Sequence, residues 1–355
     1  MRDYWHKKPL LVRQAIPGFQ PLLSRAELLQ LAEQEDVESR LIVHTTQWSM
    51  KRGPFTRKQI PPFKQQGWTV LVQGVDMLVD EVHDLMQQFR FVPDARLDDL
   101  MISYATDGGG VGPHFDSYDV FLLQAHGRRH WRIGQQTDLS LQPDVPLKIL
   151  ANFAPEQEFV LEPGDMLYLP PRYAHDGVAQ GECMTYSIGF RSPTAEELQR
   201  EILQRMAESA EQDAAVLYQD PQQTAVAESG AIPAALAQFA QSAVQVALQD
   251  PQAIARALGE YLTEPKPHVW FEASDEDCAP AAFERVVLSR KTRMLFHEHH
   301  IFINGESFLA SGPDALLMQQ LANARSLQAT DVKRLTEAAR EILHQWCEDG
   351  WAAYD

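Results

Sequence analysis

The feature that most constrains this chain is a change of hydrophobic period between Leu97 and Phe190, where apolar residues recur at every second position. Short runs rich in β-forming residues follow one another at 100–104, 120–123, 130–133, 159–161, 166–169 and 184–190. Glycine and proline turns separate these runs, for example at 108–110 and 163–165. Because alternate side chains of a strand lie on opposite faces, each run can bury one face. The pattern predicts an antiparallel barrel or a double-sheet jelly roll.

Two helices are predicted among the strands that precede Leu97. Ser24 and Glu27 have the Ser-x-x-Glu spacing of a capping box, which predicts a helix start at that point. A second helix is predicted over 78–91, where apolar residues recur at spacings of three and four and Pro93 follows. The N-terminal part therefore mixes strands with helices.

A change of architecture is predicted at 192–197, where a proline suits a first helical turn and Thr194 stands three residues before Glu197. Helices predominate from there to about residue 264, and their apolar faces exceed what one helix needs, so they should dock on the barrel or on a second subunit. After a proline-rich linker, strands at 285–288 and 300–303 mix with helices at 315–324 and 331–346, which suits a small α+β unit. We predict three parts: a β-rich domain at 1–191, a helical segment at 192–264 and a C-terminal domain at 265–355.

Charge and composition limit the classes of function. The 355 residues carry a formal net charge of −18, which opposes a general phosphate-binding surface and makes nucleic acid an improbable partner, whereas a basic protein would be attracted. No apolar run approaches the ~18 residues of a membrane span, and the first residues lack the apolar core of a secretory signal. The three cysteines, Cys183, Cys278 and Cys347, are scattered and odd in number, so we expect a reducing cytoplasm.

Three residues in the β-rich region have the types and spacing of a metal site. His114 and Asp116 follow a glycine-rich turn and, as residues i and i+2 of an extended segment, can bind one ion from the same face. A turn, an apolar strand and the step Pro170-Pro171 then deliver His175, 61 residues after the first histidine. Two imidazoles and one carboxylate leave three octahedral positions open, which suits the oxygen chemistry of non-haem Fe(II).

These residues, with the stretches at 98–103, 108–116, 118–121 and 127–132, resemble the Jumonji C type of cupin-fold oxygenases, which depend on Fe(II), 2-oxoglutarate and O2. Within that family the chain is most similar to bacterial ribosomal oxygenases that hydroxylate an arginine of large-subunit ribosomal protein sixteen. The resemblance implies a double-stranded β-helix, then a helical dimerisation segment and a winged-helix-like C-terminal domain. It also implies a homodimer.

A 2-oxoglutarate molecule would need a cation inside the barrel, because an unpaired buried anion is costly. Arg129 shares strand parity with Trp131 and Ile133, which should point inward, and the resemblance places the anchor for the distal carboxylate at this position. The resemblance also makes the hydroxyl of Ser103 a contact for the cosubstrate. Thr185 and Ser187 share parity on the last strand and can add hydroxyls, although the family member that the chain most resembles carries an amide at the position of Thr185.

The substrate expected from the resemblance is a basic ribosomal protein, hydroxylated on the β-carbon of an arginine. Asp107, Asp119 and Asp176 are the acidic residues nearest in sequence to the metal ligands, and we predict that one or more of them pairs with the guanidinium. Residues 265–355 hold 9 Lys+Arg and 14 Asp+Glu, so the C-terminal domain is expected to contact protein rather than DNA.

Two alternatives remain open at this stage: a different cupin metalloenzyme that acts on a small metabolite, and a protein-binding cupin without catalysis. The histidine cluster at 296–300 lacks the His-Glu-x-x-His spacing and is not expected to bind metal. Cys183 is expected to be a small buried hydrophobe.

Overall fold

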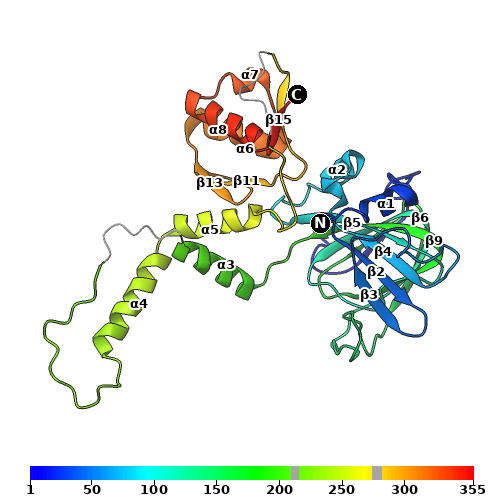
Figure 1. Cartoon of the computed structure of the whole chain (residues 1–355), viewed down its shortest axis with the longest axis horizontal. Coiled ribbons are helices and arrows are strands. Elements are labelled where there is room, and N and C mark those ends of the chain that lie inside the picture. Colours follow the sequence, from blue (N-terminus) through cyan, green and yellow to red (C-terminus); the bar gives the residue numbers. More distant parts are fainter. Residues whose placement is uncertain (209–215, 274–281) are drawn as a thin grey trace. The chain divides into compact units, whose positions relative to one another are not determined.

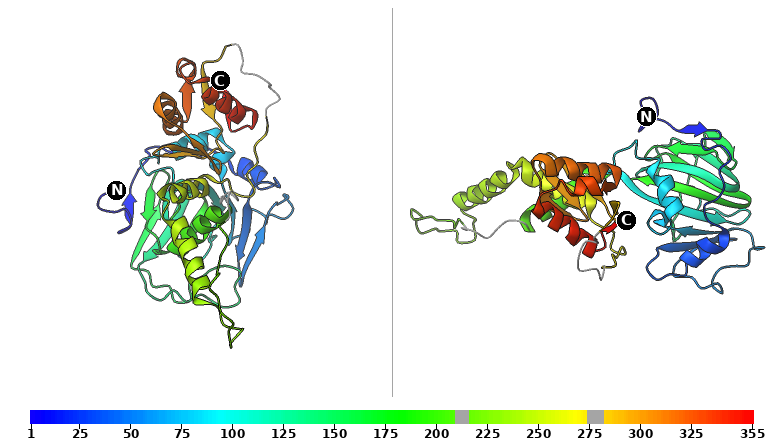
Figure 2. Two further views of the ribbon diagram at one scale, coloured as in Figure 1. Left: turned by 90° about the vertical axis from the view of Figure 1, so that its left-hand side faces the viewer. Right: turned by 90° about the horizontal axis from the view of Figure 1, so that it is seen from above.

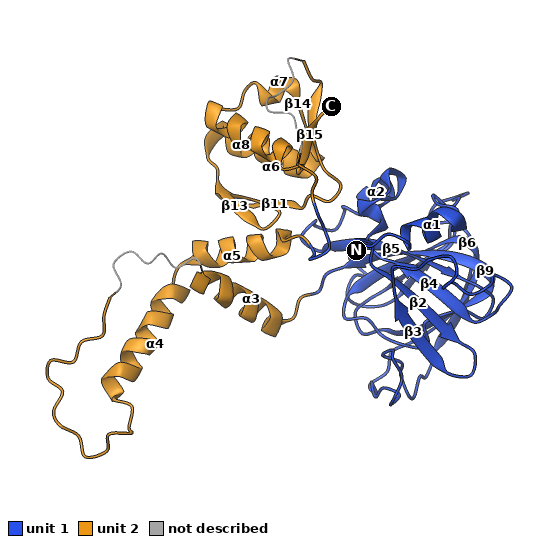
Figure 3. Ribbon diagram, in the orientation of Figure 1, with its two compact units in different colours: residues 1–192, 266–270 blue, residues 193–265, 271–355 orange. Residues whose placement is uncertain are grey.

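A computed structural model describes residues 1–208, 216–273 and 282–355 of the protein. The chain forms two compact units, coloured separately in Figure 3. The first contains residues 1–192 and 266–270, and the second contains 193–265 and 271–355. The first unit thus ends one residue from the predicted boundary of the β-rich domain, but the linker residues 266–270 belong with it. The further division at residue 264 stays a prediction, since the helical and C-terminal segments share one unit.

The first unit is an antiparallel nine-stranded sheet, visible in Figures 1 and 2, so the prediction of a mainly β domain is confirmed. Its strands are β1 (Leu10–Val12), β2 (Ser39–His44), β3 (Trp48–Arg52), β4 (Trp68–Val72), β5 (Leu97–Ala105), β6 (Asp119–Gly134), β7 (Gln157–Leu161), β8 (Met166–Leu169) and β9 (Ala174–Phe190). The order is β1-β8-β6-β9-β5-β4-β2-β3, and β7 pairs with β6. The runs predicted separately at 120–123 and 130–133 are the two halves of one strand, β6.

Bulges in the middle of β6 and β9 shape this domain. Register shifts occur on both sides of His126: β6 holds one extra residue between Gln124 and His126, and β9 holds two extra residues between His126 and Arg128. An extra residue reverses which side chains face inward. Val120 and Leu122 in the first half therefore share one buried cluster with Trp131 and Ile133 in the second half, despite their opposite parity. We call the side of the strands that faces this cluster the inner face.

The opposite face of the sheet packs on helices. Leu28 and Leu29 of α1 (Arg25–Leu31) and Val82 and Leu85 of α2 (Asp80–Gln87) lie in the largest buried cluster, together with Ile102 of β5. The capping box predicted for α1 is present: the backbone N of Ser24 donates to Glu27 Oε2 (2.7 Å), and the backbone N of Glu27 donates to Ser24 Oγ (3.3 Å). A short 3₁₀ turn, η1 (Val75–Met77), precedes α2.

The second unit begins with three helices, α3 (Ala195–Glu208), α4 (Ala234–Leu248) and α5 (Pro251–Thr263). Arg205 of α3 forms an ion pair with Glu264, directly after α5. Neither α3 nor α4 has a fully buried side chain in the chain as described, and Val244 and Val246 of α4 are 58% and 67% exposed.

The C-terminal segment forms two small sheets and three helices around a core that includes Leu321, Leu343 and Trp346. The elements are β10 (Arg285–Leu288), β11 (Met294–His297), β12 (His300–Ile303), β13 (Glu306–Leu309), α6 (Gly312–Ala324), β14 (Ser326–Gln328), α7 (Ala329–Val332), α8 (Glu337–Glu348) and β15 (Ala352–Tyr354). The single helix predicted at 331–346 is wrong: it is two helices, because Thr336 caps α8 by accepting a hydrogen bond from the N of Ala339. None of the helices in the described ranges is long and apolar enough to span a bilayer.

Candidate metal centre and cosubstrate site

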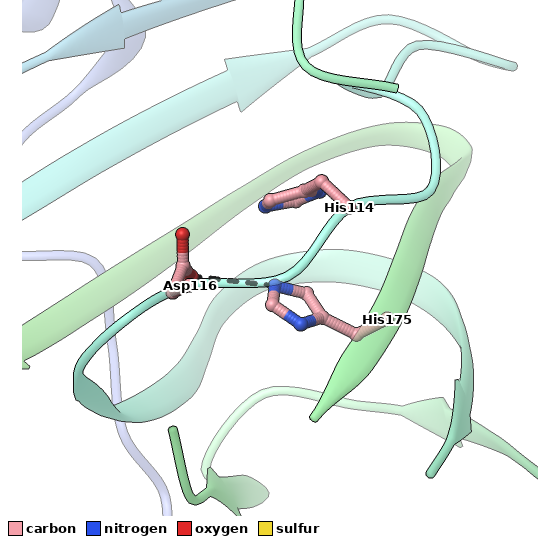
Figure 4. A group of neighbouring side chains, drawn as sticks. All are labelled: His114, Asp116 and His175. Carbon is pink, nitrogen blue, oxygen red and sulfur yellow. Dashed lines mark ion pairs between the residues drawn. The ribbon is translucent and has the colours of Figure 1, made fainter. Parts of the chain in front are cut away.

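His114, Asp116 and His175, which we call the triad, come together as Figure 4 shows. One ligand atom from each lies within 4.8 Å of the others. His114 and Asp116 lie between β5 and β6, and His175 is the second residue of β9. Two backbone hydrogen bonds hold the histidines side by side, from His114 N to His175 O (2.9 Å) and from His175 N to His114 O (2.8 Å). The distance from His175 Nε2 to Asp116 Oδ2 is 3.6 Å.

Both histidines present the same ring nitrogen to this group. Nδ1 of His114 lies 2.8 Å from Gly112 O, and Nδ1 of His175 lies 2.9 Å from Tyr173 O. A carbonyl only accepts, so each Nδ1 carries a proton and donates it, and each Nε2 is the ring nitrogen left to face the group. Burial, followed by the nearby His114, lowers the pKa of His175 to about 4, so its imidazole is neutral at pH 7. A neutral Nε2 is the form that ligates a metal.

The sequence around the triad explains this geometry. Gly110 allows close approach, since a Cβ there would lie 2.6 Å from Gly177 O of β9. Gly112 has a φ of +78°, which other residues adopt poorly. The backbone N of Arg172 donates to Asp116 O (2.7 Å), so the turn before β9 holds the carboxylate segment in place. The two halves of the site are therefore fixed by backbone contacts.

Arg129 lies on the inner face of β6, and only 5% of it is exposed. It pairs with Ala179, and two and four positions further Trp131 and Ile133 pair with Gly177 and His175. Directly opposed residues of an antiparallel pair share a face, so Arg129 and His175 lie on the same face. Its Nε and Nη2 have no hydrogen-bond partner in the described chain. A buried guanidinium with two unpaired donors fits a carboxylate.

The three predicted hydroxyls lie on the same inner face. Ser103 pairs with Thr185, and Ser187 pairs with Leu122. Ser103 Oγ donates to Thr185 O (3.3 Å). Thr185 Oγ1 donates to Gln124 Oε1 (2.9 Å), so the fully buried Gln124 supplies an amide beside Thr185. Sequence reasoning missed Gln124, because the bulge that follows it hides its parity.

The structure does not bring Asp107, Asp119 or Asp176 to the triad. Asp107 accepts hydrogen bonds from Gly181 N (2.7 Å), near the middle of β9, and from Gln66 Nε2 (2.9 Å). Asp119 is fully buried and contacts Tyr168 Oη (2.6 Å), Arg96 (3.0 Å) and His6 (2.8 Å). Asp176 follows His175 and so lies on the other face of β9, paired with Arg132 (2.5 Å). Each carboxylate is already engaged away from the inner face.

Two other acidic residues, Asp98 and Asp99, lie at the inner face instead. Leu97 pairs with Phe190 and Leu100 with Ile188, so β5 holds one extra residue opposite Gly189. A Cβ on Gly189 would lie 3.8 Å from Asp99 Oδ1 and 3.8 Å from Tyr118 Cε2. Burial, with the charges of Asp116, Asp99 and Asp98, raises the pKa of the Tyr118 hydroxyl. These carboxylates therefore lie near the side chain of Tyr118, as Asp116 of the triad does.

Sequence reasoning passed over the Asp98–Asp99 pair for a physical reason. Adjacent residues of a regular strand point to opposite faces, whereas a bulge aims both to one side. Asp99 accepts a hydrogen bond from Gln73 Nε2 (2.8 Å), and Asp98 contacts Arg191 (3.3 Å). Beneath them, Asp76 accepts from Leu100 N (2.7 Å), which supports the bulge from the other side.

The histidines at 296–300 and the cysteines are the remaining candidates that the sequence singled out. Within residues 1–208, 216–273 and 282–355, the triad is the one group of three or more potential ligands close enough to hold a metal, so the histidines at 297–300 do not form such a group. Cys183 is buried with Ala105 and Ala179. Cys278 lies outside the described residues.

Comparison with known proteins agrees with this geometry. Residues 84–198, which contain the triad, Arg129 and the three hydroxyls, match the JmjC domain model. The β-rich unit contains a JmjC domain. Residues 247–353 match the model of a ROXA-like winged helix, which confirms the C-terminal fold predicted from the resemblance.

Among relatives, a ribosomal protein uL16 3-hydroxylase of Escherichia coli K12 is 40% identical over 202 residues, covering 56% of this chain and 53% of that protein. A probable ribosomal oxygenase of Haemophilus influenzae is 37% identical over 203 residues, covering 56% and 50%. The matched region thus spans about half the length of these relatives. The crystal structure of E. coli YcfD has a TM-score of 0.87 at 28% identity, covering 100% of this chain and 96% of that one. A YcfD structure in complex with cobalt and 2-oxoglutarate has a TM-score of 0.83.

Proposed function

We propose that this protein is an Fe(II)- and 2-oxoglutarate-dependent hydroxylase of a large-subunit ribosomal protein, acting on the β-carbon of an arginine. The observation that carries the proposal is the triad of two imidazoles and one carboxylate, with His175 on the same inner face as Arg129, whose Nε and Nη2 lack partners in the described chain. The likeness to a uL16 hydroxylase and to a ribosomal oxygenase seen with cobalt and 2-oxoglutarate supports it.

The residues present fit this cosubstrate and metal. His114 Nε2, Asp116 and His175 Nε2 would hold Fe(II) and leave adjacent positions open. Bound iron supplies the coupled chemistry in which O2 and 2-oxoglutarate give succinate, CO2 and one hydroxyl group on the substrate. Arg129 would bind the distal carboxylate through two parallel hydrogen bonds, with Ser103, Thr185 and Ser187 as further contacts.

The protein's own contribution is to orient the cosubstrate and keep water out. The inner face is lined by apolar side chains from both halves of β6, namely Val120, Leu122, Trp131 and Ile133. An apolar lining strengthens the interaction of Arg129 with a carboxylate, because the local dielectric is low. The glycine and carbonyl contacts around the triad fix both histidine rings before any ligand binds.

A cationic substrate fits the charge of the protein. The net charge of −18 attracts a basic ribosomal protein. Near the triad, the Asp98–Asp99 pair with Tyr118 is better placed to receive a guanidinium than the acids predicted from sequence. The reacting C–H bond is apolar, so recognition has to act at the tip of the side chain, where a guanidinium offers two donors to a carboxylate.

The proposal extends to assembly and location. We infer a homodimer formed through residues 192–264, since the exposed apolar side chains of α4 need a partner. A ribosomal protein substrate favours the cytoplasm, and the C-terminal domain is proposed to contact protein rather than nucleic acid. These assignments rest on sequence, exposure and charge.

The decisive experiment combines the protein with Fe(II), 2-oxoglutarate and the large-subunit ribosomal proteins of its source organism, followed by mass spectrometry. We expect one oxygen to be added to one arginine and one succinate to form per hydroxylation, with neither product from a His175→Ala variant. Turnover of 2-oxoglutarate that depends on a small metabolite, with all ribosomal proteins unmodified, would contradict the proposal and favour a metabolite-directed cupin enzyme.

A further inference from the structure

Lys266 places a cation directly on the Asp98–Asp99 pair. Its Nζ lies 3.0 Å from Asp98 Oδ1 and 3.1 Å from Asp99 Oδ2, and its side chain is 22% exposed. Lys266 lies between Pro265 and Pro267, directly after α5, yet residues 266–270 belong to the compact unit that contains the barrel. A segment distant in sequence therefore delivers a positive charge beside the triad.

This contact differs from an ordinary surface ion pair. The side chain of Asp99 is only 5% exposed, and the bulge of β5 turns its carboxylate to the same side as that of Asp98. Gly189 leaves the space in which these carboxylates meet the Tyr118 ring. Arg191 also contacts Asp98, whereas Asp99 receives a hydrogen bond from the neutral amide of Gln73. A buried carboxylate without a cation is costly, so Asp99 is the member of the pair that most needs the ammonium of Lys266.

Resting on the function proposed above, we propose that Lys266 is an internal competitor for the substrate: its ammonium occupies the Asp98–Asp99 pair until the guanidinium of the target arginine replaces it. The exchange conserves charge at the pair, since one monovalent cation leaves as another arrives. A guanidinium can then bind with two donors where the ammonium acts as a point charge. Pro267 keeps Lys266 in an extended conformation, so only its flexible side chain has to withdraw.

The competition has a defined thermodynamic signature. The pair is free of the Lys266 ammonium, or open, for only a fraction of the time. The apparent affinity of every cation that binds there is the intrinsic affinity multiplied by that fraction. A pair that is open about one tenth of the time weakens binding about tenfold. The factor is the same for an arginine and a lysine side chain, whereas a neutral side chain that binds without displacing the ammonium does not experience it.

The test uses the full chain loaded with Co(II) and 2-oxoglutarate, which permits binding to be measured by calorimetry without turnover. The probes are a uL16 peptide that carries the target arginine and the same peptide with citrulline, an uncharged analogue of similar shape, in its place. Lys266→Met keeps most of the aliphatic stem and removes the charge. Lys58→Met, at an exposed lysine outside these contacts, is the matched control for net charge.

We expect Lys266→Met to bind the arginine peptide about tenfold more tightly than the unaltered protein, while its affinity for the citrulline peptide stays the same. Lys58→Met should change neither affinity by more than about twofold. Lys266→Arg places a stronger competitor on the pair, so it should lower the affinity for the arginine peptide. This variant provides the test if Lys266→Met does not fold.

The role of Lys266 is wrong if folded Lys266→Met binds the arginine peptide no more tightly than the unaltered protein does. The same holds if Lys266→Arg binds the arginine peptide as tightly as the unaltered protein. If the unaltered protein still hydroxylates its substrate normally, the proposed function stands. If no ribosomal peptide is bound or hydroxylated by the unaltered protein or either variant, the proposed substrate class and this inference fail together.

Discussion

Replacing Arg129 by Met should change protein stability and cosubstrate binding in opposite directions. Arg129 is 5% exposed, and neither Nε nor Nη2 of its guanidinium meets an acceptor in the described chain. Without a ligand, the fold therefore bears the cost of a buried charge with unpaired donors. Met fills much of the same space without that charge. Arg129→Met should accordingly stabilise the protein in the absence of ligands while it removes the partner of a carboxylate.

The magnitudes follow from general values. Replacing a buried, poorly compensated ionic group by an apolar residue stabilises by about 1 to 4 kcal/mol. Two hydrogen bonds between a guanidinium and a carboxylate contribute about 1.5 kcal/mol or more each. Their loss should therefore lower the affinity for 2-oxoglutarate roughly 100-fold or more. A structural arginine would instead lose stability on substitution and leave ligand affinity almost unchanged.

The assay combines urea unfolding of the ligand-free protein with calorimetric titration of 2-oxoglutarate in the presence of Co(II). Arg128→Met is the matched control, because this neighbouring residue is exposed and lies on the other face of β6. It should change the free energy of unfolding by less than about 0.5 kcal/mol and leave the affinity unaltered. The reasoning is refuted if Arg129→Met unfolds at lower urea and still binds 2-oxoglutarate as tightly as the unaltered protein.

Three further predictions test the site and the assembly. His175→Ala should abolish succinate formation and bound metal while the thermal unfolding midpoint stays within a few degrees, and normal turnover in this variant would remove the triad from the mechanism. Asp76→Asn concerns stability: burial, with the charge of Asp99, raises the pKa of Asp76 to about 7. Since the folded state then holds the proton more tightly than the unfolded state, stability is present below about pH 4 and is lost as pH rises towards 7, by up to ~1.4 kcal/mol per unit. Asp76→Asn should lack this loss and be more stable than the unaltered protein at pH 8; an identical pH dependence of unfolding in both proteins would contradict this pKa. For the dimer, Val244→Glu with Val246→Glu should yield monomers in sedimentation at micromolar concentration, and a monomeric unaltered protein would dispose of the proposed dimer.

Local signals in the sequence determined several parts of this protein. The capping box at Ser24 and Glu27 acts over one turn of helix, so its residues alone predict it. The convergence of the triad was equally predictable, because His114 and Asp116 share a face by strand alternation and His175 follows a turn with strong signals. The inward direction of Arg129 also followed from alternation, which holds along the uninterrupted half of β6.

Tertiary structure decided what depends on bulges and on contacts between distant segments. Asp98 and Asp99 point to one side only because β5 holds an extra residue opposite Gly189, and no local pattern marks that residue as extra. Proximity in sequence misled the choice of Asp107, Asp119 and Asp176, since each carboxylate is engaged by partners away from the triad. The meeting of Lys266 with the acidic pair joins residues 167 positions apart. Alternation and capping are short-range rules and apply within one element, whereas registers and ion pairs between elements depend on how the whole domain packs.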